Sequence, residues 1–152
     1  MEWIKVNFGK NIGMTLPQVM FKDPDWFFWA CEKSVFKGGL EREAEEINRK
    51  ARSIKVPQNG EEKMVVEYII DKTTEKFGTM QIVPESRPYH KGSSTFFRSD
   101  VIDMSIPRQI YPGDKFGNQN FILALKIILF GNTSYKMTKR RCGEFFENGH
   151  NF

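Results

Sequence analysis

The stretch FGKNIGMTLPQVMFKDPDWFFW, residues 8–29, constrains the fold more than any other part of the chain. Gly9 and Gly13 have a spacing that suits a tight turn between two extended pieces, because glycine accepts a positive φ without a Cβ clash. Thr15 and Gln18 form a capping-box pattern, in which each side chain bonds to the backbone amide of the other residue. The stretch therefore predicts a turn followed by a helix that begins just after Thr15.

A second helix is predicted to begin at Asp23-Pro24, because Asp is a good N-cap and Pro is pre-organised for the first helical position. Aromatic residues load this helix: Trp26, Phe27, Phe28 and Trp29. We expect Gly38-Gly39 to end it. Upstream, residues 3–8 alternate with the period of a half-buried strand. The strand face expected to pack on the aromatic helix comprises Ile4, Val6 and Phe8.

The order of residues in this stretch resembles the module at the C-terminal end of exodeoxyribonuclease X-like proteins, which also occurs in short stand-alone bacterial and phage proteins. The residues that carry the resemblance are Phe8, Gly9, Lys10, Gly13, Thr15, Leu16, Asp23, Pro24, Trp26 and Trp29. Where the family often has a second basic residue before the glycine, this chain has Ile12. In those exonucleases the module lies beside the catalytic domain. The resemblance therefore implies association with DNA processing rather than a reaction, and it points to a module turn formed by Phe8, Gly9, Lys10 and Gly13.

Length and composition bound the possible classes of protein. The 152 residues fit one domain or two very small ones, and the aromatic fraction of 14% means that a few large side chains carry much of the burial. The net charge of +4 favours contact with polyanions without demanding it. Cys31, Cys142, His90 and His150 have no metal-ligand spacing, so we expect neither a metal nor another cofactor.

The sequence also lacks targeting signals. The N-terminus has no basic region followed by a long apolar run, so no signal peptide is predicted. The longest apolar run, residues 121–130, is about half the length that spans a bilayer as a helix. We therefore expect a soluble, cytoplasmic protein.

Residues 40–55 are predicted to form an amphipathic helix. Its narrow apolar stripe recurs at steps of four and three and comprises Leu40, Ala44, Ile47, Ala51 and Ile54. The stripe fits a dimer seam or an internal contact. Acidic residues precede basic ones along this helix, as the helix dipole favours. The basic end is either a solvated helix end or a phosphate contact.

A soft boundary follows at residues 56–60, where Pro and an Asn-Gly pair break the helical pattern. Residues 64–70 and 77–83 are rich in β-branched and aromatic residues and predict a hairpin. We expect further short strands within residues 100–110 and a turn at residues 111–114.

Residues 121–130 suit either a helix or a buried strand, and the Ile content and the apolar character of both faces favour the strand. A short helix capped by Thr138 is predicted near the C-terminus. The fold class is therefore α+β: an N-terminal strand and turn with helices (residues 1–56), followed by a β-rich antiparallel half (residues 57–152). The two parts form one compact domain or two small ones, and the β-rich part is a closed barrel or an open sheet.

The segment RPYHKGSSTFFR, residues 87–98, has the composition of a nucleic-acid site. It combines three cations with aromatic residues and contains no acid, and single-stranded nucleic acid is held by positive grooves and aromatic stacking platforms. The candidate binding residues in it are Arg87, Tyr89, Lys91, Phe96 and Arg98. The alternative is a surface β-hairpin whose phenylalanines belong to the core.

A second basic cluster opens the C-terminal helix, where positive charge opposes the helix dipole. It comprises Lys139, Arg140 and Arg141. An anionic partner would explain this placement, and a solvated tail is the alternative.

No catalytic constellation is recognisable in the sequence. It has no Walker loop and no Gly-x-Ser-x-Gly elbow, and its acidic residues do not follow the spacing of a two-metal nuclease. Two functions remain. The first is a non-catalytic accessory protein that binds DNA, preferably single-stranded. The second is a small phage- or plasmid-type protein that binds and modulates a host DNA-processing or defence protein.

Overall fold

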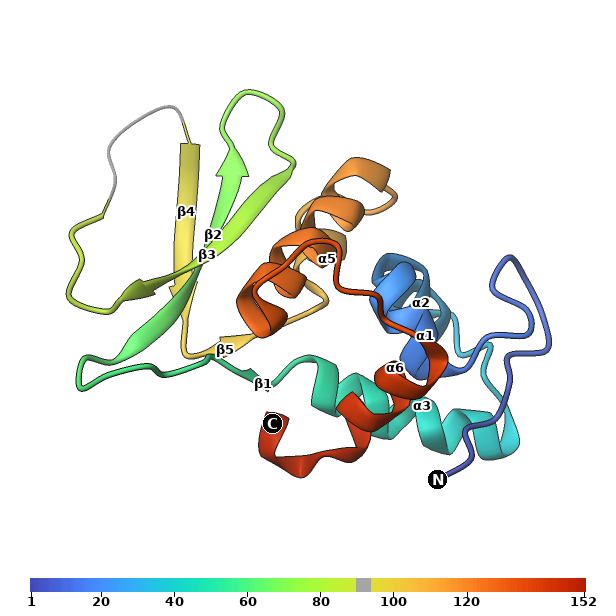
Figure 1. Ribbon diagram of the computed structural model, residues 1–152. Helices are drawn as coiled ribbons and strands as arrows, with labels where there is room; N and C mark the ends of the chain where they lie inside the picture. Colours follow the sequence, from blue (N-terminus) through green and yellow to red (C-terminus); the bar gives the residue numbers. More distant parts are fainter. Residues whose placement is uncertain (90–93) are drawn as a thin grey trace.

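The three-stranded sheet lies at one end of the molecule, helix α5 (Lys115–Phe130) packs against it, and the remaining large helices gather beyond α5 (Figure 1). The structure is a computed structural model that describes residues 1–89 and 94–152, and the side chains of residues 94–96 lie outside the description. Most helices belong to the N-terminal and C-terminal parts of the chain, and most strands belong to its middle part. The predicted α+β class is confirmed.

The N-terminal helices begin where the local sequence caps them. They are α1 (Leu16–Lys22), α2 (Pro24–Glu32) and α3 (Gly38–Ala51). The capping box is present, because Thr15 accepts from the Gln18 amide and the Gln18 side chain accepts from the Thr15 amide. Asp23 accepts from the Trp26 amide and caps α2, with Pro24 in the first turn. The predictions for these two helix starts are confirmed.

The sheet has the order β3-β2-β4, and its strands are β2 (Met64–Asp71), β3 (Phe77–Pro84) and β4 (Ser94–Ser99). The hairpin β2-β3 confirms the prediction and pairs Glu67 with Gln81. On the other side β2 pairs with β4, placing Glu67 opposite Arg98. The sheet is open rather than closed into a barrel. A separate two-stranded pair joins β1 (Ile54–Lys55) to β5 (Val101–Ile102).

Helices complete the second half of the chain. They are α4 (Ile106–Ile110), α5 (Lys115–Phe130), α6 (Lys139–Glu147) and the short 3-10 helix η1 (Gly149–Asn151). Thr138 accepts from the Arg141 amide, so the predicted cap of the C-terminal helix is confirmed. Residues 111–114 form the expected turn, and Asp114 at its end caps α5 by accepting from the Gly117 amide.

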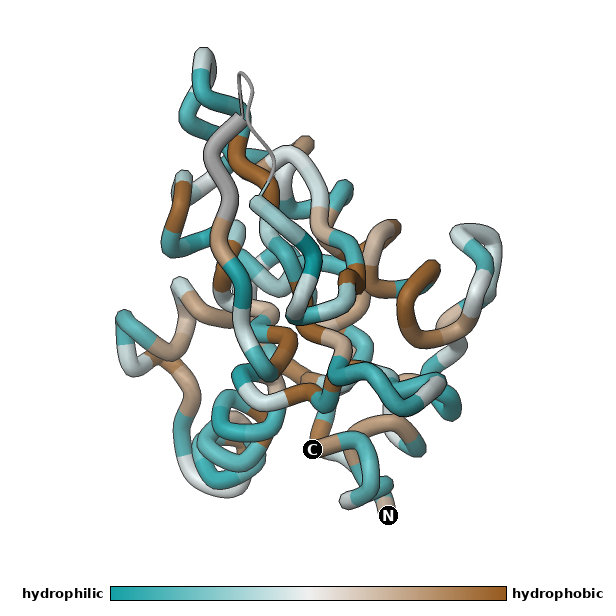
Figure 2. Tube along the Cα trace, turned by 90° about the vertical axis from the view of Figure 1, so that its left-hand side faces the viewer, coloured by the Kyte–Doolittle hydropathy of each residue, from teal (hydrophilic) through white to brown (hydrophobic). Residues whose placement is uncertain are grey.

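One hydrophobic core joins the parts of the sequence on either side of residue 56. It includes Leu16 and Phe27 from the first part and Tyr68 and Phe121 from the second, all fully buried. In Figure 2, hydrophobic stretches alternate with hydrophilic ones along the trace, and several of the hydrophobic stretches lie toward the middle of the molecule. The apolar stripe of α3 belongs to this core, so it is an internal contact.

The strand prediction for residues 121–130 was wrong, because they are the C-terminal part of α5. Asp114 caps the start of this helix. Gly131, with φ 74°, ends it in the left-handed conformation and donates its amide to the Ile127 carbonyl. These end signals lie outside the apolar run. Both faces of the run are apolar. One face packs in the core, and the other, with Leu123 and Ile127, stays accessible.

Three other local predictions were wrong in part. Only Val101–Ile102 is a strand within residues 100–110, because Pro107 lies in the first turn of α4, where its ring fits a helix. Gly38 and Gly39 begin α3, while α2 already ends at Glu32. The helix predicted over residues 40–55 ends at Ala51, and the last residue of its stripe instead pairs in β1.

Residues 3–8 do not form the predicted strand and make one isolated bridge, between Lys5 and Thr15. Trp3 and Val6 are buried, whereas Ile4 is 43% exposed, so the burial does not alternate with period two. The predicted contact of Phe8 with the aromatic helix is present, because its ring lies 5.8 Å from that of Trp26.

Candidate functional site

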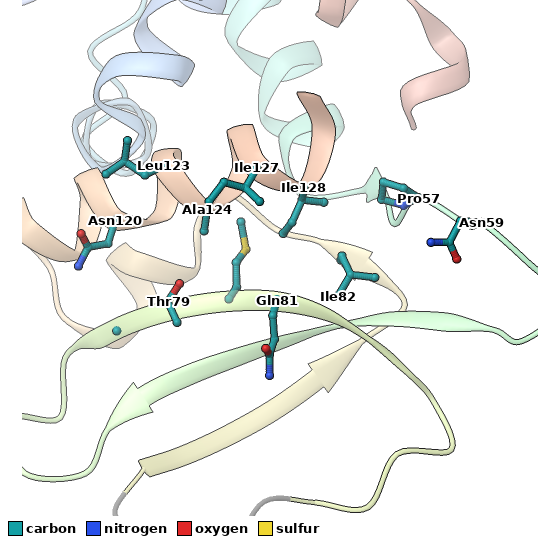
Figure 3. A pocket seen from close by; sticks show the side chains of 12 residues that line it. Pro57, Asn59, Thr79, Gln81, Ile82, Asn120, Leu123, Ala124, Ile127 and Ile128 are labelled. Carbon is teal, nitrogen blue, oxygen red and sulfur yellow. The ribbon is translucent and has the colours of Figure 1, made fainter. Parts of the chain in front are cut away.

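A groove of about 570 Å³ lies between β3 and α5 (Figure 3). One wall is strand β3 and the other is the accessible face of α5, while the segment after β1 closes one end. The lining residues are Pro57, Asn59, Gly78, Thr79, Met80, Gln81, Ile82, Asn120, Leu123, Ala124, Ile127 and Ile128. Figure 3 shows β3 and α5 on opposite sides of the groove, with Pro57 and Asn59 at one end.

The groove follows the edge of β3 rather than one face of the sheet. Five consecutive residues of the strand, 78–82, line it, and successive side chains of a strand point to opposite faces. A cavity that contacts all five therefore runs along the strand's side. β3 is the terminal strand of the order β3-β2-β4, so this side has no neighbouring strand.

The backbone direction of β3 follows from its pairing with β2. Glu85 donates its amide to the Lys63 carbonyl at 2.9 Å, next to the register pair Met64 and Pro84. Because backbone groups alternate in direction along an antiparallel strand, the N–H and C=O groups of Met80 and Ile82 point away from β2. Within the described residues, these four groups have no hydrogen bond outside the sheet.

The α5 wall presents an apolar ridge to solvent. Leu123 is 44% exposed and Ile127 is 53% exposed. They stand four residues apart and so lie one above the other on the same face of the helix. The opposite face packs in the core through Phe121 and Leu125, both fully buried. α5 is therefore anchored to the core on the side opposite the ridge.

None of the groove's lining side chains is charged. Its polar groups are the amides of Asn59, Asn120 and Gln81 and the hydroxyl of Thr79. Such a lining suits an apolar ligand that also offers hydrogen-bond donors and acceptors, and it offers nothing to attract a phosphate backbone. It also contains no nucleophile paired with a base.

The predicted basic segment is organised differently, because its Arg98 is built into the sheet. The Arg98 side chain is 9% exposed and donates Nε to the Glu67 carboxylate at 2.9 Å. Its Nη1 donates to the carbonyls of Arg87 at 2.8 Å and Glu85 at 3.3 Å, and the guanidinium lies 4.3 Å from the ring centroid of Tyr89. Arg98 therefore holds the chain that leaves β3 against the sheet.

The Glu67 carboxylate is the other half of this cluster. Its side chain is 4% exposed and also accepts from Gln81 Nε2 at 2.9 Å. Burial raises the pKa of Glu67, but the hydrogen bonds from Gln81 and Arg98 outweigh it and hold the pKa below its usual value. The carboxylate is therefore ionised and paired in the folded protein.

Two candidates of the basic segment stay accessible to a partner. Arg87 is exposed, and Tyr89 is 62% exposed. Lys91 lies outside the described residues. Phe96 belongs to β4 and pairs with Ile69, but its side chain is not described.

The C-terminal cluster begins α6, which lies on the other side of α5 from the chain that follows β3, residues 85–89 (Figure 1). Arg140 pairs with Glu144 at 2.7 Å. Arg141 donates to the Lys136 carbonyl at 2.8 Å and lies 4.5 Å from the Tyr135 ring centroid. Lys139 is exposed, and no ion pair joins it to the part of the chain that the structure describes.

The module turn is a structural element of the N-terminal region. Gly9 and Gly13 have φ of 71° and 87°, as the sequence predicts. Lys10 pairs at 2.9 Å with the same Asp23 carboxylate that caps α2, and Phe8 packs on Trp26. Lys10 and Phe8 thus contact the N-cap and the first turn of α2.

Sequence reasoning missed the groove. The only signal for it was the apolar character of residues 121–130 on both faces, which was interpreted as a buried strand. Nothing in the sequence around residues 78–82 indicates that β3 is a terminal strand.

Within residues 1–89 and 94–152, no group of three or more His, Cys, Asp or Glu side chains is arranged to hold a metal ion. No helix in the same ranges is long and apolar enough to cross a membrane. No protein-family model matches this chain, and no curated protein or solved structure matches it either.

Proposed function

We propose that this protein is a non-catalytic binding protein that takes up a segment of a partner protein in the groove between β3 and α5. The observation that carries the proposal is the uncharged groove along a sheet edge, walled by the exposed apolar ridge of Leu123 and Ile127. Exposed apolar surface next to a concave site is typical of protein interaction sites.

The class of partner comes from the sequence. The resemblance of residues 8–29 to the exodeoxyribonuclease X module is the basis for seeking the partner among DNA-processing or defence proteins. A phage- or plasmid-type protein that modulates such a host protein fits a chain without a recognisable catalytic constellation. The uncharged lining favours a polypeptide over a nucleic acid as the occupant.

The test is site-directed photocrosslinking in cells. A benzophenone amino acid replaces Asn120 inside the groove, and in a matched control it replaces exposed Lys72 in the turn between β2 and β3. A partner that is crosslinked from position 120 but not from position 72 is purified, and its binding to the wild-type protein is measured by titration. We expect the double substitution Leu123→Glu with Ile127→Glu to abolish this binding.

The matched control is Phe116→Glu, on the same helix but outside the groove, at a side chain that is 78% exposed. We expect it to bind the purified partner as the wild type does. Equal binding by the wild type and the groove variant would refute the proposal.

Nucleic-acid binding is retained as a second candidate because of the exposed Arg87 and Tyr89 beside the ordered Arg98. The test is fluorescence anisotropy of labelled single- and double-stranded DNA at low and moderate salt. The informative variant is Arg87→Ala with Tyr89→Ala, because substitution of Arg98 would also release the crossover. Binding that weakens with salt and is lost in this variant supports the candidate, and no binding at low salt excludes it.

A further inference from the structure

We propose that a second pocket, between the C-terminal end of α5 and helix α6, binds a nucleobase, with the phosphate next to that base held by Arg141. The pocket has a volume of about 260 Å³. Its lining residues are Leu129, Phe130, Tyr135, Met137, Arg141, Glu144, Phe145, Asn148 and Asn151. It shares no lining residue with the groove between β3 and α5, so this proposal does not rest on the proposed function.

The first argument is a stack of flat groups in the lining. The ring centroids of Phe130 and Tyr135 lie 4.4 Å apart, and the two rings are 19° from parallel. The Arg141 guanidinium lies 4.5 Å from the Tyr135 centroid, and its Nη1 donates to the Lys136 carbonyl at 2.8 Å, which holds it in place. Bases of single strands stack on aromatic rings and on guanidinium planes. This lining therefore suits a planar ring.

The second argument comes from two carboxamides that line the pocket. Asn148 Oδ1 accepts from the His150 amide at 3.0 Å, and Asn151 Nδ2 donates to the Phe145 carbonyl at 2.9 Å. Within the described residues, no hydrogen bond uses the donor Nδ2 of Asn148 or the acceptor Oδ1 of Asn151. The Asn151 amide donates to the Asn148 carbonyl at 3.1 Å, so both residues belong to one turn.

A nucleobase can use both free halves of these carboxamides. The edge of a base presents donors and acceptors side by side, as adenine does with its N6 amine and its N7 atom. A phenyl ring from a partner protein offers neither, and an indole offers a donor alone. Of these planar groups, only the base pairs with the donor of Asn148 and the acceptor of Asn151.

The third argument is the charge around the pocket. Residues 131–143 contain no acid, and their four cations are Lys136, Lys139, Arg140 and Arg141. Glu144 is the only acid among the described lining residues, and it is neutralised by Arg140, whose Nε donates to it at 2.7 Å. In the part of the chain that the structure describes, no hydrogen bond uses Nε or Nη2 of Arg141. These groups suit a phosphate, which a guanidinium binds through charge-assisted hydrogen bonds.

The experiment titrates the intact, isotope-labelled protein with deoxyadenosine monophosphate, with deoxyribose phosphate, which lacks the base, and with a single-stranded deoxyadenosine octamer. Nuclear magnetic resonance follows the side-chain amide signals of Asn148 and Asn151. We expect the nucleotide to shift both signals at up to millimolar concentration. It should bind at least about tenfold more tightly than the sugar phosphate, because stacking and edge pairing need the base.

The informative substitution is Asn148→Asp. It replaces only the free Nδ2 donor, because the remaining oxygen still accepts from the His150 amide and caps η1. The matched control is Asn132→Asp, which makes the same change outside the lining and keeps the oxygen that accepts from the Ser134 amide. We expect Asn148→Asp to weaken nucleotide binding at least about tenfold and the control to stay within about twofold of the wild type.

A second pair of variants tests stacking. Tyr135→Ala removes the ring and Tyr135→Phe keeps it. We expect the alanine variant to bind the nucleotide at least about tenfold more weakly than the wild type and the phenylalanine variant to bind as the wild type does. Equal binding by the alanine variant and the wild type would contradict the stacked arrangement.

Three results overturn the proposal. Equal binding of the nucleotide and the sugar phosphate would mean that the cations bind phosphate alone. Equal weakening by Asn148→Asp and Asn132→Asp would assign the effect to added charge rather than to the lost donor. No shift of either amide signal with millimolar nucleotide or octamer would exclude the site.

The octamer identifies the source of the base. Binding at least about tenfold tighter than that of the mononucleotide points to single-stranded nucleic acid, because further phosphates then contact the surrounding cations. Equal affinities point to a free nucleotide. Neither result bears on the groove, whose occupant the photocrosslinking experiment tests separately.

Discussion

The two sides of strand β3 differ in chemistry: one carries a buried ion pair and the other borders an uncharged groove. On the face that bears Gln81, the Glu67 and Arg98 side chains are buried, paired and bound to the carbonyls of the crossover that follows β3. On the side that faces α5, an uncharged groove leaves the apolar ridge of Leu123 and Ile127 accessible. Arg98, which the sequence suggested as a nucleic-acid contact, is thus a structural residue. Leu123 and Ile127, which belong to no recognisable motif, are exposed to solvent.

The comparison changes how the basic segment is interpreted. Arg98 was a candidate nucleic-acid contact because it lies among aromatic residues in a segment without acids. In the fold its neutralising acid is Glu67, which comes from another strand and pairs with it directly. Charge along a sequence therefore does not reveal which cations remain unpaired in three dimensions.

The largest expected effect is on the buried pair. Arg98→Met leaves the Glu67 carboxylate buried without its cation, and we expect a loss of about 3 kcal/mol in the free energy of unfolding. Urea unfolding followed by circular dichroism measures it. The matched control combines Arg98→Met with Glu67→Leu, which removes both charges and should cost less than the single substitution. A single variant within about 0.5 kcal/mol of the wild type would contradict the structural role of Arg98.

A smaller effect is expected at the start of α2, where Asp23 has local and long-range partners. It caps the helix, pairs with Lys10 and accepts from Asn118 Nδ2 of α5 at 2.9 Å. Asp23→Ala should cost about 1.5 kcal/mol in the free energy of unfolding, in the upper range for a cap. The control is Thr138→Ala, which removes a cap whose side-chain hydrogen bond is local, from the Arg141 amide. Equal costs would show that the contact with α5 adds nothing.

Acid should reduce the stability that the Glu67–Arg98 pair contributes to the fold. The pKa of Glu67 is lowered in the folded protein, so its stabilising contribution is present above the unfolded pKa of about 4.3 and is lost as the pH falls through the folded pKa. We expect Glu67→Gln to be less stable than the wild type at neutral pH and the difference to shrink as the pH falls below about 4. Urea unfolding along a pH series measures both curves. A constant difference between them would assign the stabilisation to something other than the carboxylate's charge.

The smallest effect on stability is expected in the groove. Leu123→Glu with Ile127→Glu changes accessible side chains, so the free energy of unfolding should stay within about 0.5 kcal/mol per substitution of the wild type. Urea unfolding measures it, with Phe116→Glu as the matched surface control on the same helix. A loss well beyond the control's would mean that the ridge supports the core rather than a partner.

Much of the local structure was predictable because its signals lie within a few residues of each other. Thr15, Asp23 and Thr138 each cap the helix that follows, and in each case the bonded amide lies three residues away. The hairpin β2-β3 was predicted for the same reason, since two β-rich runs are separated by a short polar turn.

The candidate site was predictable only in part. Arg87 and Tyr89 are accessible, as a binding segment requires, and Arg98 lies beside them but in a buried pair. The groove was not anticipated, because its two walls are far apart in the chain and neither has a distinctive motif. The apolar surface of residues 121–130 was noticed, yet its length and Ile content fit a buried strand as well as a helix.

By itself the sequence determined the starts of α1, α2 and α6, the β2-β3 hairpin and the α+β class, because capping, turn chemistry and period-two patterning act over a few residues. The tertiary structure alone decided that Glu67 neutralises Arg98, that residues 121–130 are helical, and that β3 is a terminal strand beside α5. These outcomes depend on contacts between residues distant in sequence. Their free energies are set by burial and by the partner that folding brings close, and neither is encoded in the local pattern.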